Sequence, residues 1–438
     1  MVLNIYNIVG PMNFTKFGKK MTSNAGILSL MDDLGRAKSA NGESMVMMGG
    51  GNPAQIPEFQ EIMRQELLEL CSDPAGFKRL VGSYGSPQGE SCFLEGLATL
   101  LKKEQGWDVT AENICLTNGS QTAFFMLFNL FGGEMEDGSR KNICLPMAPE
   151  YIGYADLGLE EELFVSTKPT IEIQDDIFFK YHIDFDKLQI DDSTGAICIS
   201  RPTNPTGNVV TDGELSKLSD LAKKHNIPLI VDCAYGLPFP GMIYTDATPV
   251  WDEHLIVSLS LSKLGLPAVR TGIVVASKEI IRALTSMNAI MSLSPNSFGA
   301  LLAEKLVASR RITTLSKEMM QPYYSQKKDR AVQAVKELFE GTPCRVHVPE
   351  GAMFLWLWFE NLPISSLELY ERLKSAGVLV VSGHYFFPGL REEWKHKDEC
   401  LRVTYSQDDA DVKKGLAIIA QVVRKAYENN AELCDSES

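Results

Sequence analysis

The sequence offers few of the groupings that build disulfide frameworks or metal sites. It has nine cysteines and six histidines in 438 residues, and the nearest cysteines, Cys71 and Cys92, lie 21 positions apart. No CxxC, HxH or HxxxH pair occurs. Scattered cysteines in odd number indicate reduced thiols in a reducing compartment. We therefore expect a cytoplasmic protein without a structural metal.

Basic charge and long apolar runs are also scarce. The chain carries 42 Lys and Arg against 56 Asp and Glu, which gives a formal net charge of −14. This balance argues against broad binding of nucleic acids or anionic membranes, although one basic pocket for a small anion remains compatible with it. No stretch approaches the roughly 18 apolar residues of a transmembrane helix. The first residues lack the basic flank of a signal peptide.

The middle of the chain has the pattern of an α/β domain. Short runs there are apolar throughout, which suits strands covered on both faces of a mostly parallel sheet. Thr211 and Glu214 form a capping box that predicts a helix before the strand at 229–232. The predicted strands are 114–117, 143–146, 196–200, 229–232, 256–260 and 272–276.

The C-terminal part is typical of a smaller α+β domain. We expect a strand or hairpin at 345–358, a helix at 367–376, strands at 378–382 and 401–406, and a final amphipathic helix. The predicted division is an N-terminal segment at 1–50, a large cofactor domain at 51–320 and a small domain at 321–438. Residues 1–50 are too few for a domain and should pack on the small one.

Two segments at predicted strand ends contain partners for an anion. Residues 117–121 follow a strand and open a helix at 122–131, where backbone N–H groups suit a phosphate; a plain strand-to-helix turn is the alternative. In the segment 260–272, two serines and an arginine suit a dianionic phosphate. Lys263 lies there at the end of a buried strand, where burial can lower a lysine pKa by about 3–5 units and make the amine a nucleophile.

Four further residues suit a flat heterocyclic ligand. The rigid loop at 200–208 holds Asn204, whose amide can point at a ligand or form an Asx turn. Asp232 ends a buried strand and needs a partner, which a protonated ring nitrogen or a structural hydrogen bond would supply. Tyr235 can reach the same ligand, and Tyr151 can stack on a ring or lie in the core. Lysine, acid, amide, phenol and phosphate-binding groups together describe the partners of pyridoxal phosphate.

Three motifs resemble those of the type I pyridoxal-phosphate-dependent aminotransferases. They are SRPTNPTGN at 200–208, VDCAYG at 231–236 and SLSKLGLPAVR at 260–270, in the family's order. The resemblance runs from about Phe14 to Tyr427. The implied fold is α/β, with a large domain around a mostly parallel seven-stranded sheet and a smaller α+β domain. Four longer segments resemble the valine–pyruvate branch of this family, at 26–34, 49–57, 148–166 and 349–359.

The resemblance implies a role for each matching residue around pyridoxal 5'-phosphate. Lys263 would hold the cofactor covalently and later move a proton between substrate and cofactor. Asp232 would keep the pyridine nitrogen protonated, while Asn204 and Tyr235 would hold the phenolic oxygen. Tyr151 would stack on the ring.

The same resemblance assigns the residues around the ligand's charged groups. Arg402 would clamp the substrate carboxylate, with Asn204 and the backbone of Gly51 beside it. Arg270 lies seven residues after Lys263, where many family members have eight, so we expect a tighter loop. Tyr84 would reach the phosphate of the partner subunit in a homodimer. The phosphate of the same subunit would be held by Ser120, Gln121, Ser260, Ser262 and Arg270.

The expected reaction is ping-pong transamination between L-valine and pyruvate, giving 3-methyl-2-oxobutanoate and L-alanine. Its partners would be amino acids and 2-oxo acids. A carbon–sulfur lyase, or an aminotransferase of different specificity, is the alternative on the same scaffold. A DNA-binding regulator is a third hypothesis, which is not favoured because residues 1–50 contain no basic helix pair and the chain as a whole is acidic. Met353, Phe354, Trp356 and Trp358 could line an apolar wall for the substrate side chain, but half of them should face the core because side chains alternate along a strand.

Overall fold

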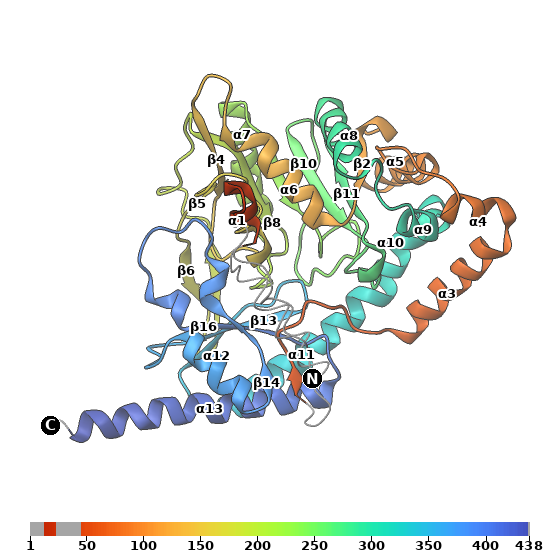
Figure 1. The fold of residues 1–438 in the computed structure, drawn as a ribbon. Helices are drawn as coiled ribbons and strands as arrows, with labels where there is room; N and C mark the ends of the chain where they lie inside the picture. Colours follow the sequence, from red (N-terminus) through yellow and green to blue (C-terminus); the bar gives the residue numbers. More distant parts are fainter. Residues whose placement is uncertain (1–12, 23–44, 437–438) are drawn as a thin grey trace.

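The computed structural model describes residues 13–22 and 45–436, with side chains described up to residue 429. The segment 26–34, which resembles the valine–pyruvate branch, lies outside these residues. Two large sheets, of eight and six strands, organise the described chain, and a two-stranded sheet accompanies them (Figure 1). Within this part of the chain, no helix has both the length and the apolar character needed to cross a bilayer.

The larger sheet confirms the predicted mostly parallel α/β domain. Strands β4, β8, β9 and β10 run parallel, β5 joins β4 in parallel, and β11 and β2 close one end in antiparallel pairing. The two-residue β3 adds an antiparallel eighth strand to the expected seven. The bounds are β2 Ile114–Thr117, β3 Gly133–Glu134, β4 Arg140–Leu145, β5 Phe164–Ser166, β8 Thr194–Ser200, β9 Leu229–Asp232, β10 Leu255–Ser260 and β11 Gly272–Val275.

Helices cover both faces of this sheet, as the continuous apolar runs predict. Alternate residues of β8 and β9 enter different cores: Ile199 and Val231 pack in one, Cys198 and Ile230 in the other. Helices α5 (Ser91–Gln105) and α7 (Asp212–His225) contribute to the first core, and α6 (Ser120–Phe131) and α8 (Lys278–Ser292) to the second. The predicted capping box is present at the start of α7.

The second sheet has six strands in the order β15-β16-β13-β12-β7-β6. Two of them come from residues 170–182, in the middle of the chain, so this sheet draws on both sides of residue 320. The domain division at that residue stays a prediction. The bounds are β6 Thr170–Ile173, β7 Phe178–His182, β12 Cys344–His347, β13 Phe354–Phe359, β15 Val381–Ser382 and β16 Cys400–Thr404.

The predicted strand at 378–382 is divided between two sheets. Its first half, β14 (Val378–Leu379), pairs in parallel with β1 (Val46–Met47), and its second half, β15, pairs with β16. Gly49 explains the close approach at the break, since a Cβ there would lie 2.7 Å from the Val380 carbonyl oxygen. This pairing fixes the residues after Met47 against the C-terminal part.

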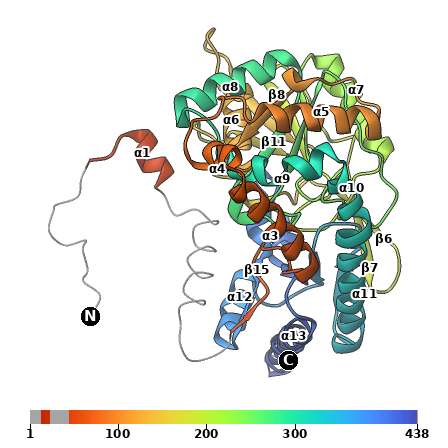
Figure 2. The same ribbon diagram turned by 90° about the vertical axis from the view of Figure 1, so that its right-hand side faces the viewer.

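The remaining helices connect and flank the two sheets. A long helical stretch, α10 through α11, runs down from the large sheet to lie beside α13 (Figure 2). The bounds are α1 Lys16–Met21, α3 Pro57–Ser72, α4 Pro74–Val81, α9 Phe298–Ala308, α10 Arg311–Leu315, α11 Gln321–Leu338, α12 Ser366–Ser375 and α13 Asp409–Ser436, with short helical turns at Ala111–Asn113, Ile152–Tyr154, Pro267–Val269, Ser316–Met320, Gly383–Phe386 and Lys395–Asp398.

Candidate active site

A cavity of about 810 Å³ opens at the carboxyl ends of β8, β9 and β10. This is the edge of an open α/β sheet at which ligands bind. Segments from near both chain ends close it, one after β1 and one after β16. Twelve of the thirteen residues predicted from the sequence line the cavity: Gly51, Ser120, Gln121, Tyr151, Asn204, Asp232, Tyr235, Ser260, Ser262, Lys263, Arg270 and Arg402.

Tyr84 is the predicted site residue that the structure leaves outside the cavity. Its side chain is 83% exposed on the surface. A residue that contributes to the site of a neighbouring subunit is expected to be exposed on the surface of its own chain. Its predicted role therefore depends on an assembly and stays a prediction.

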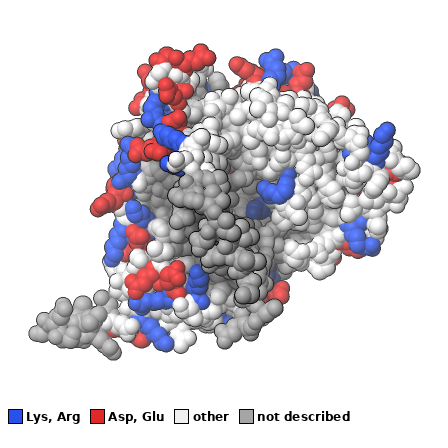
Figure 3. Space-filling view, in the orientation of Figure 1, with Lys and Arg blue, Asp and Glu red and all other residues white. Residues whose placement is uncertain are grey.

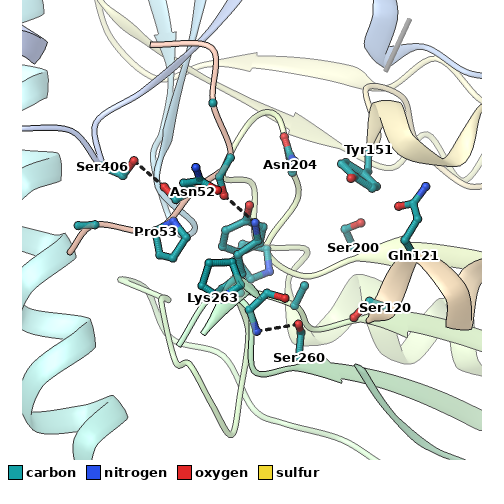
Figure 4. Close-up of a pocket in the computed structure, with 18 of the residues that line it drawn as sticks. Asn52, Pro53, Ser120, Gln121, Tyr151, Ser200, Asn204, Ser260, Lys263 and Ser406 are labelled. Atoms are coloured by element: carbon teal, nitrogen blue, oxygen red, sulfur yellow. Dashed lines mark hydrogen bonds between the residues drawn. The ribbon is translucent and has the colours of Figure 1, made fainter. Parts of the chain in front are cut away.

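Lys263 lies on the cavity floor just after β10, with its amine directed at the opposite wall (Figure 4). Its Nζ donates a hydrogen bond to the Gly51 carbonyl oxygen at 2.7 Å. The pKa of Lys263 is lowered to about 8, mainly by burial and also by the positive charges of Arg402 and Arg270, against the opposing effect of Asp232. Near neutral pH a useful fraction of this amine is therefore uncharged and nucleophilic.

Asp232 ends β9 with its carboxylate held by two donors. The Tyr154 hydroxyl donates to Oδ2 at 2.7 Å, and the Ala234 N–H donates to Oδ1 at 2.9 Å. Burial raises the pKa of Asp232. Sequence reasoning missed Tyr154, although a buried acid at a strand end requires a donor and the predicted site residue Tyr151 lies three positions earlier.

The turn at 118–120 and the loop at 260–270 form one anion-binding end. Ser120 opens α6, and the Ser262 N–H donates to Ser260 Oγ at 3.0 Å. Gly119 has φ +85°, and a Cβ there would lie 2.3 Å from Arg270 Nη2, so this close approach requires glycine. The shorter loop does bring Arg270 to the cavity, by way of a helical turn that ends with Arg270 at φ +48°.

Gln121 and Tyr151 lie together on the side of the cavity opposite Ser406 (Figure 4). Gln121 Nε2 donates to the Gly153 carbonyl oxygen at 2.9 Å, which fixes its amide. The Tyr151 ring is half-buried and packs edge-on against Tyr154, with ring centroids 5.3 Å apart. One face of the cavity therefore carries an aromatic ring beside the anion-binding end.

Arg402 reaches the opposite end of the cavity from β16. Its Nη1 donates to Asn204 Oδ1 at 2.8 Å and its Nη2 to the Gly49 carbonyl oxygen at 2.6 Å. The guanidinium lies 4.3 Å from the ring centroid of Phe354, and burial lowers its pKa to about 10. Among the described residues, its buried Nε has no hydrogen-bond partner. A buried guanidinium with a free donor suits an incoming carboxylate.

The predicted apolar wall at 353–358 is wrong. Met353, Phe354 and Trp356 are fully buried and Trp358 is half-buried, and none of the four lines the cavity. The reason is that these side chains pack in the hydrophobic core, where Trp356 contacts Phe386 and Trp358 contacts Phe179. Phe354 instead supports the Arg402 guanidinium.

Three of the additional cavity-lining residues, Asn52, Pro53 and Gln55, lie in the segment 49–57 that the resemblance marked, whereas Met47, Tyr323 and the residues at 407–408 lie outside the quoted segments. Their positions depend on contacts between distant parts of the chain, which local patterns do not reveal. Among the cavity-lining residues that the structure describes, the cations are Lys263, Arg270 and Arg402, and the acids are Asp232 and Asp408. The additional wall residues include Met47, Asn52, Pro53, Gln55, Tyr323, Gln407 and Asp408.

Comparison with known proteins agrees with this geometry. The chain is 46% identical over 416 residues to the valine–pyruvate aminotransferase of Escherichia coli, covering 95% of this chain and 99% of that one. It is 45% identical to a putative amino-acid aminotransferase of Psychrobacter arcticum, whose crystal structure superposes with a TM-score of 0.92 over 96% of this chain and 100% of that one.

A second crystal structure, of a valine–pyruvate aminotransferase from Salmonella typhimurium, shares 45% identity with a TM-score of 0.84, covering 92% of this chain and 99% of that one. Residues 49–419 match the family model described as aminotransferase class I and II. On sequence, fold and site geometry together, this chain belongs to the class I and II aminotransferases.

Proposed function

We propose that this enzyme exchanges the amino group between L-valine and pyruvate, giving 3-methyl-2-oxobutanoate and L-alanine in a ping-pong cycle. One observation carries the proposal: the weakly basic amine of Lys263 lies in one cavity with the buried acid Asp232 and the carboxylate-binding Arg402. Near-full-length identity to enzymes named for valine and pyruvate supports the choice of substrates.

We further propose pyridoxal 5'-phosphate as the cofactor, because the donor set fits each part of it. The buried Asp232 carboxylate is suited to a protonated ring nitrogen. Ser120, Ser260, Ser262 and the Arg270 guanidinium are suited to the phosphate, in a turn that a Cβ at position 119 would fill. When bound, this group supplies an electron sink that stabilises negative charge at the substrate α-carbon.

The chain's own residues bind the substrate and move the proton. Arg402, held by Asn204 and Gly49, would take the α-carboxylate through its remaining donors. That contact fixes the substrate so that its α-hydrogen faces Lys263. With a pKa near 8, the Lys263 amine can accept this proton from the substrate α-carbon and then donate it to a carbon of the cofactor. Tyr235, whose ring centroid lies 5.2 Å from Lys263 Nζ, would help hold the ring's phenolic oxygen.

The composition of the cavity favours a neutral substrate side chain. Of the three cations that line its described part, we assign Lys263 to chemistry and the two arginines to phosphate and carboxylate. An acidic side chain would have no described cation left to bind and would face Asp408. Met47, Pro53 and Tyr323 offer apolar contact instead.

We also propose that the enzyme acts as a homodimer in the cytoplasm. Phe77, Val81, Tyr84, Ile290 and Leu293 are large apolar or aromatic side chains with 48–86% exposure. They come from α4, α8 and the residues that follow them, and the face over α6 and α8 shows few charges (Figure 3). Exposed apolar surface of this kind marks an interface. In the dimer, Tyr84 would reach the cofactor phosphate of the partner subunit.

The first test is a single half-reaction with Lys263→Ala. The wild-type enzyme, loaded with pyridoxal phosphate and mixed with L-valine without an acceptor, should release about one equivalent of 3-methyl-2-oxobutanoate per site, as ping-pong kinetics require. Lys263→Ala should release none in the same time, while Lys217→Ala, at an exposed position of α7, should match the wild type. Full release by Lys263→Ala would contradict the mechanism, and continuous ammonia release from L-cystathionine would indicate the lyase instead.

The lowered pKa of Lys263 gives a pH prediction. Capture of pyridoxal phosphate by the apoprotein needs the neutral amine, so its rate should rise with pH through a midpoint near 8. A nearby cation favours the neutral amine, so its removal in Arg402→Gln should move the midpoint to higher pH. Arg372→Gln, an exposed substitution on α12, is the control. A wild-type midpoint near 10, or one unchanged in Arg402→Gln, would contradict the electrostatic account.

Hybrid dimers test the proposed assembly. Lys263→Ala chains are expected to be inactive alone and Tyr84→Ala chains weakly active. A mixture of the two should gain activity after subunit exchange, because one of the two sites in each hybrid then has both residues intact. Mass spectrometry of the intact dimers checks that exchange occurred. Exchanged dimers with no recovered activity would argue against a site shared across the interface.

A further inference from the structure

A line of hydrogen-bonded side chains connects Asp232 with the buried Glu150, and one of its members, Ser200, also lines the cavity. The Tyr154 hydroxyl, which donates to Asp232 Oδ2 at 2.7 Å, lies 3.2 Å from Ser200 Oγ. Ser200 Oγ in turn donates to Glu150 Oε2 at 2.7 Å. We call these four residues the relay. It joins two buried carboxylates through two hydroxyl groups, and Tyr154 and Glu150 are fully buried.

Glu150 is held by neutral donors. Besides Ser200 Oγ, its carboxylate accepts from the Ser200 N–H at 2.7 Å and the Tyr151 N–H at 2.9 Å. No ion pair with Glu150 occurs among the described residues. Burial raises its pKa to about 7. A buried acid without a cation is costly, and the mechanism described so far gives it no task.

The protonation state of Glu150 decides which hydrogen bonds can form along the relay between Glu150 and Asp232. With both carboxylates ionised, the Ser200 proton goes to Glu150 and the Tyr154 proton to Asp232, so no proton remains between the two hydroxyls. When Glu150 carries a proton, every neighbouring pair in the relay is joined by a hydrogen bond. Ser200 can then donate to Tyr154, and Tyr154 still donates to Asp232. The other titratable groups that interact with the relay are Cys198 and Cys233 and, on the cavity side, Lys263, Tyr151 and Tyr235.

We propose that Glu150 is a positioning residue for Asp232: through Ser200 and Tyr154, it sets how strongly Asp232 binds a protonated ring nitrogen. An ionised Glu150 places a second negative charge behind Asp232, and the Tyr154 hydrogen bond favours the ionised form of Asp232. Both effects strengthen the hold on a cation in the cavity. This inference rests on the proposed cofactor, whose ring nitrogen is the cation in question.

The test compares two ligands of the apoprotein. One is pyridoxal phosphate, and the other is its carbon analogue, in which C–H replaces the ring nitrogen. Glu150→Gln should raise the Kd of pyridoxal phosphate about tenfold, as expected for one pKa unit of lost interaction, and leave the Kd of the analogue within about twofold. Glu399→Gln, which removes another buried carboxylate near the second sheet, should change neither.

A double variant tests whether the effect passes through the relay. Tyr154→Phe should also weaken pyridoxal phosphate selectively, and adding Glu150→Gln to it should change the ratio of the two Kd values by less than Glu150→Gln does alone, because only the direct effect of the Glu150 charge then remains. Ser200→Ala removes the middle link and tests the same point if Glu150→Gln does not fold. Additive effects of the two substitutions, equal weakening of both ligands, or an unchanged ratio in Glu150→Gln would overturn the proposal. A wild-type apoprotein that binds neither ligand would instead contradict the proposed cofactor.

Discussion

The structure depends on charges that are held away from water in one cavity. Burial shifts the pKa of each charged group in the direction that favours its neutral form. The pKa of Lys263 falls to about 8, the pKa of Arg402 falls to about 10, and the pKa of Asp232 rises. Buried charges are stable only when they are paired. These groups are therefore arranged for a ligand with complementary charges, namely anionic groups for the arginines and a cationic group for Asp232. The overall charge of −14 has no bearing on this local arrangement.

The fold brings these charges together from distant parts of the sequence. Parallel strands place Asp232 and Lys263 at adjacent points of one sheet edge, since β9 and β10 are neighbours in register. Arg402 arrives on β16 of the other sheet, and Gly51 arrives through the pairing of β1 with β14. The cavity forms where the segments after β1 and β16 meet the large sheet. Its electrostatics are therefore a property of the tertiary structure.

The sequence predicted the parts of this arrangement that follow local rules. The bounds of β2 and β9 and the capping box of α7 are as predicted, because apolar runs and capping chemistry act within a few residues. The motif residues were also predicted to meet, since carboxyl ends of parallel strands share an edge.

What the sequence did not predict depends on packing between elements. The aromatic residues at 353–358 look suited to a substrate wall but pack in the hydrophobic core, whereas Met47 and Tyr323 line the cavity. Tyr154 and Glu150 were missed because their role lies in a buried network that links β4, β8 and β9. A buried aspartate indicates that a donor must exist without indicating which one.

The central claim is that a cavity with one lysine for chemistry and two arginines for the ligand's anions selects a neutral amino acid. It is tested most directly by kcat/KM for a panel of amino donors with pyruvate as acceptor. The account predicts that L-valine exceeds L-aspartate by ~10²-fold or more, because the second carboxylate of aspartate would lack a cation. An L-aspartate value equal to or above that of L-valine would contradict the account.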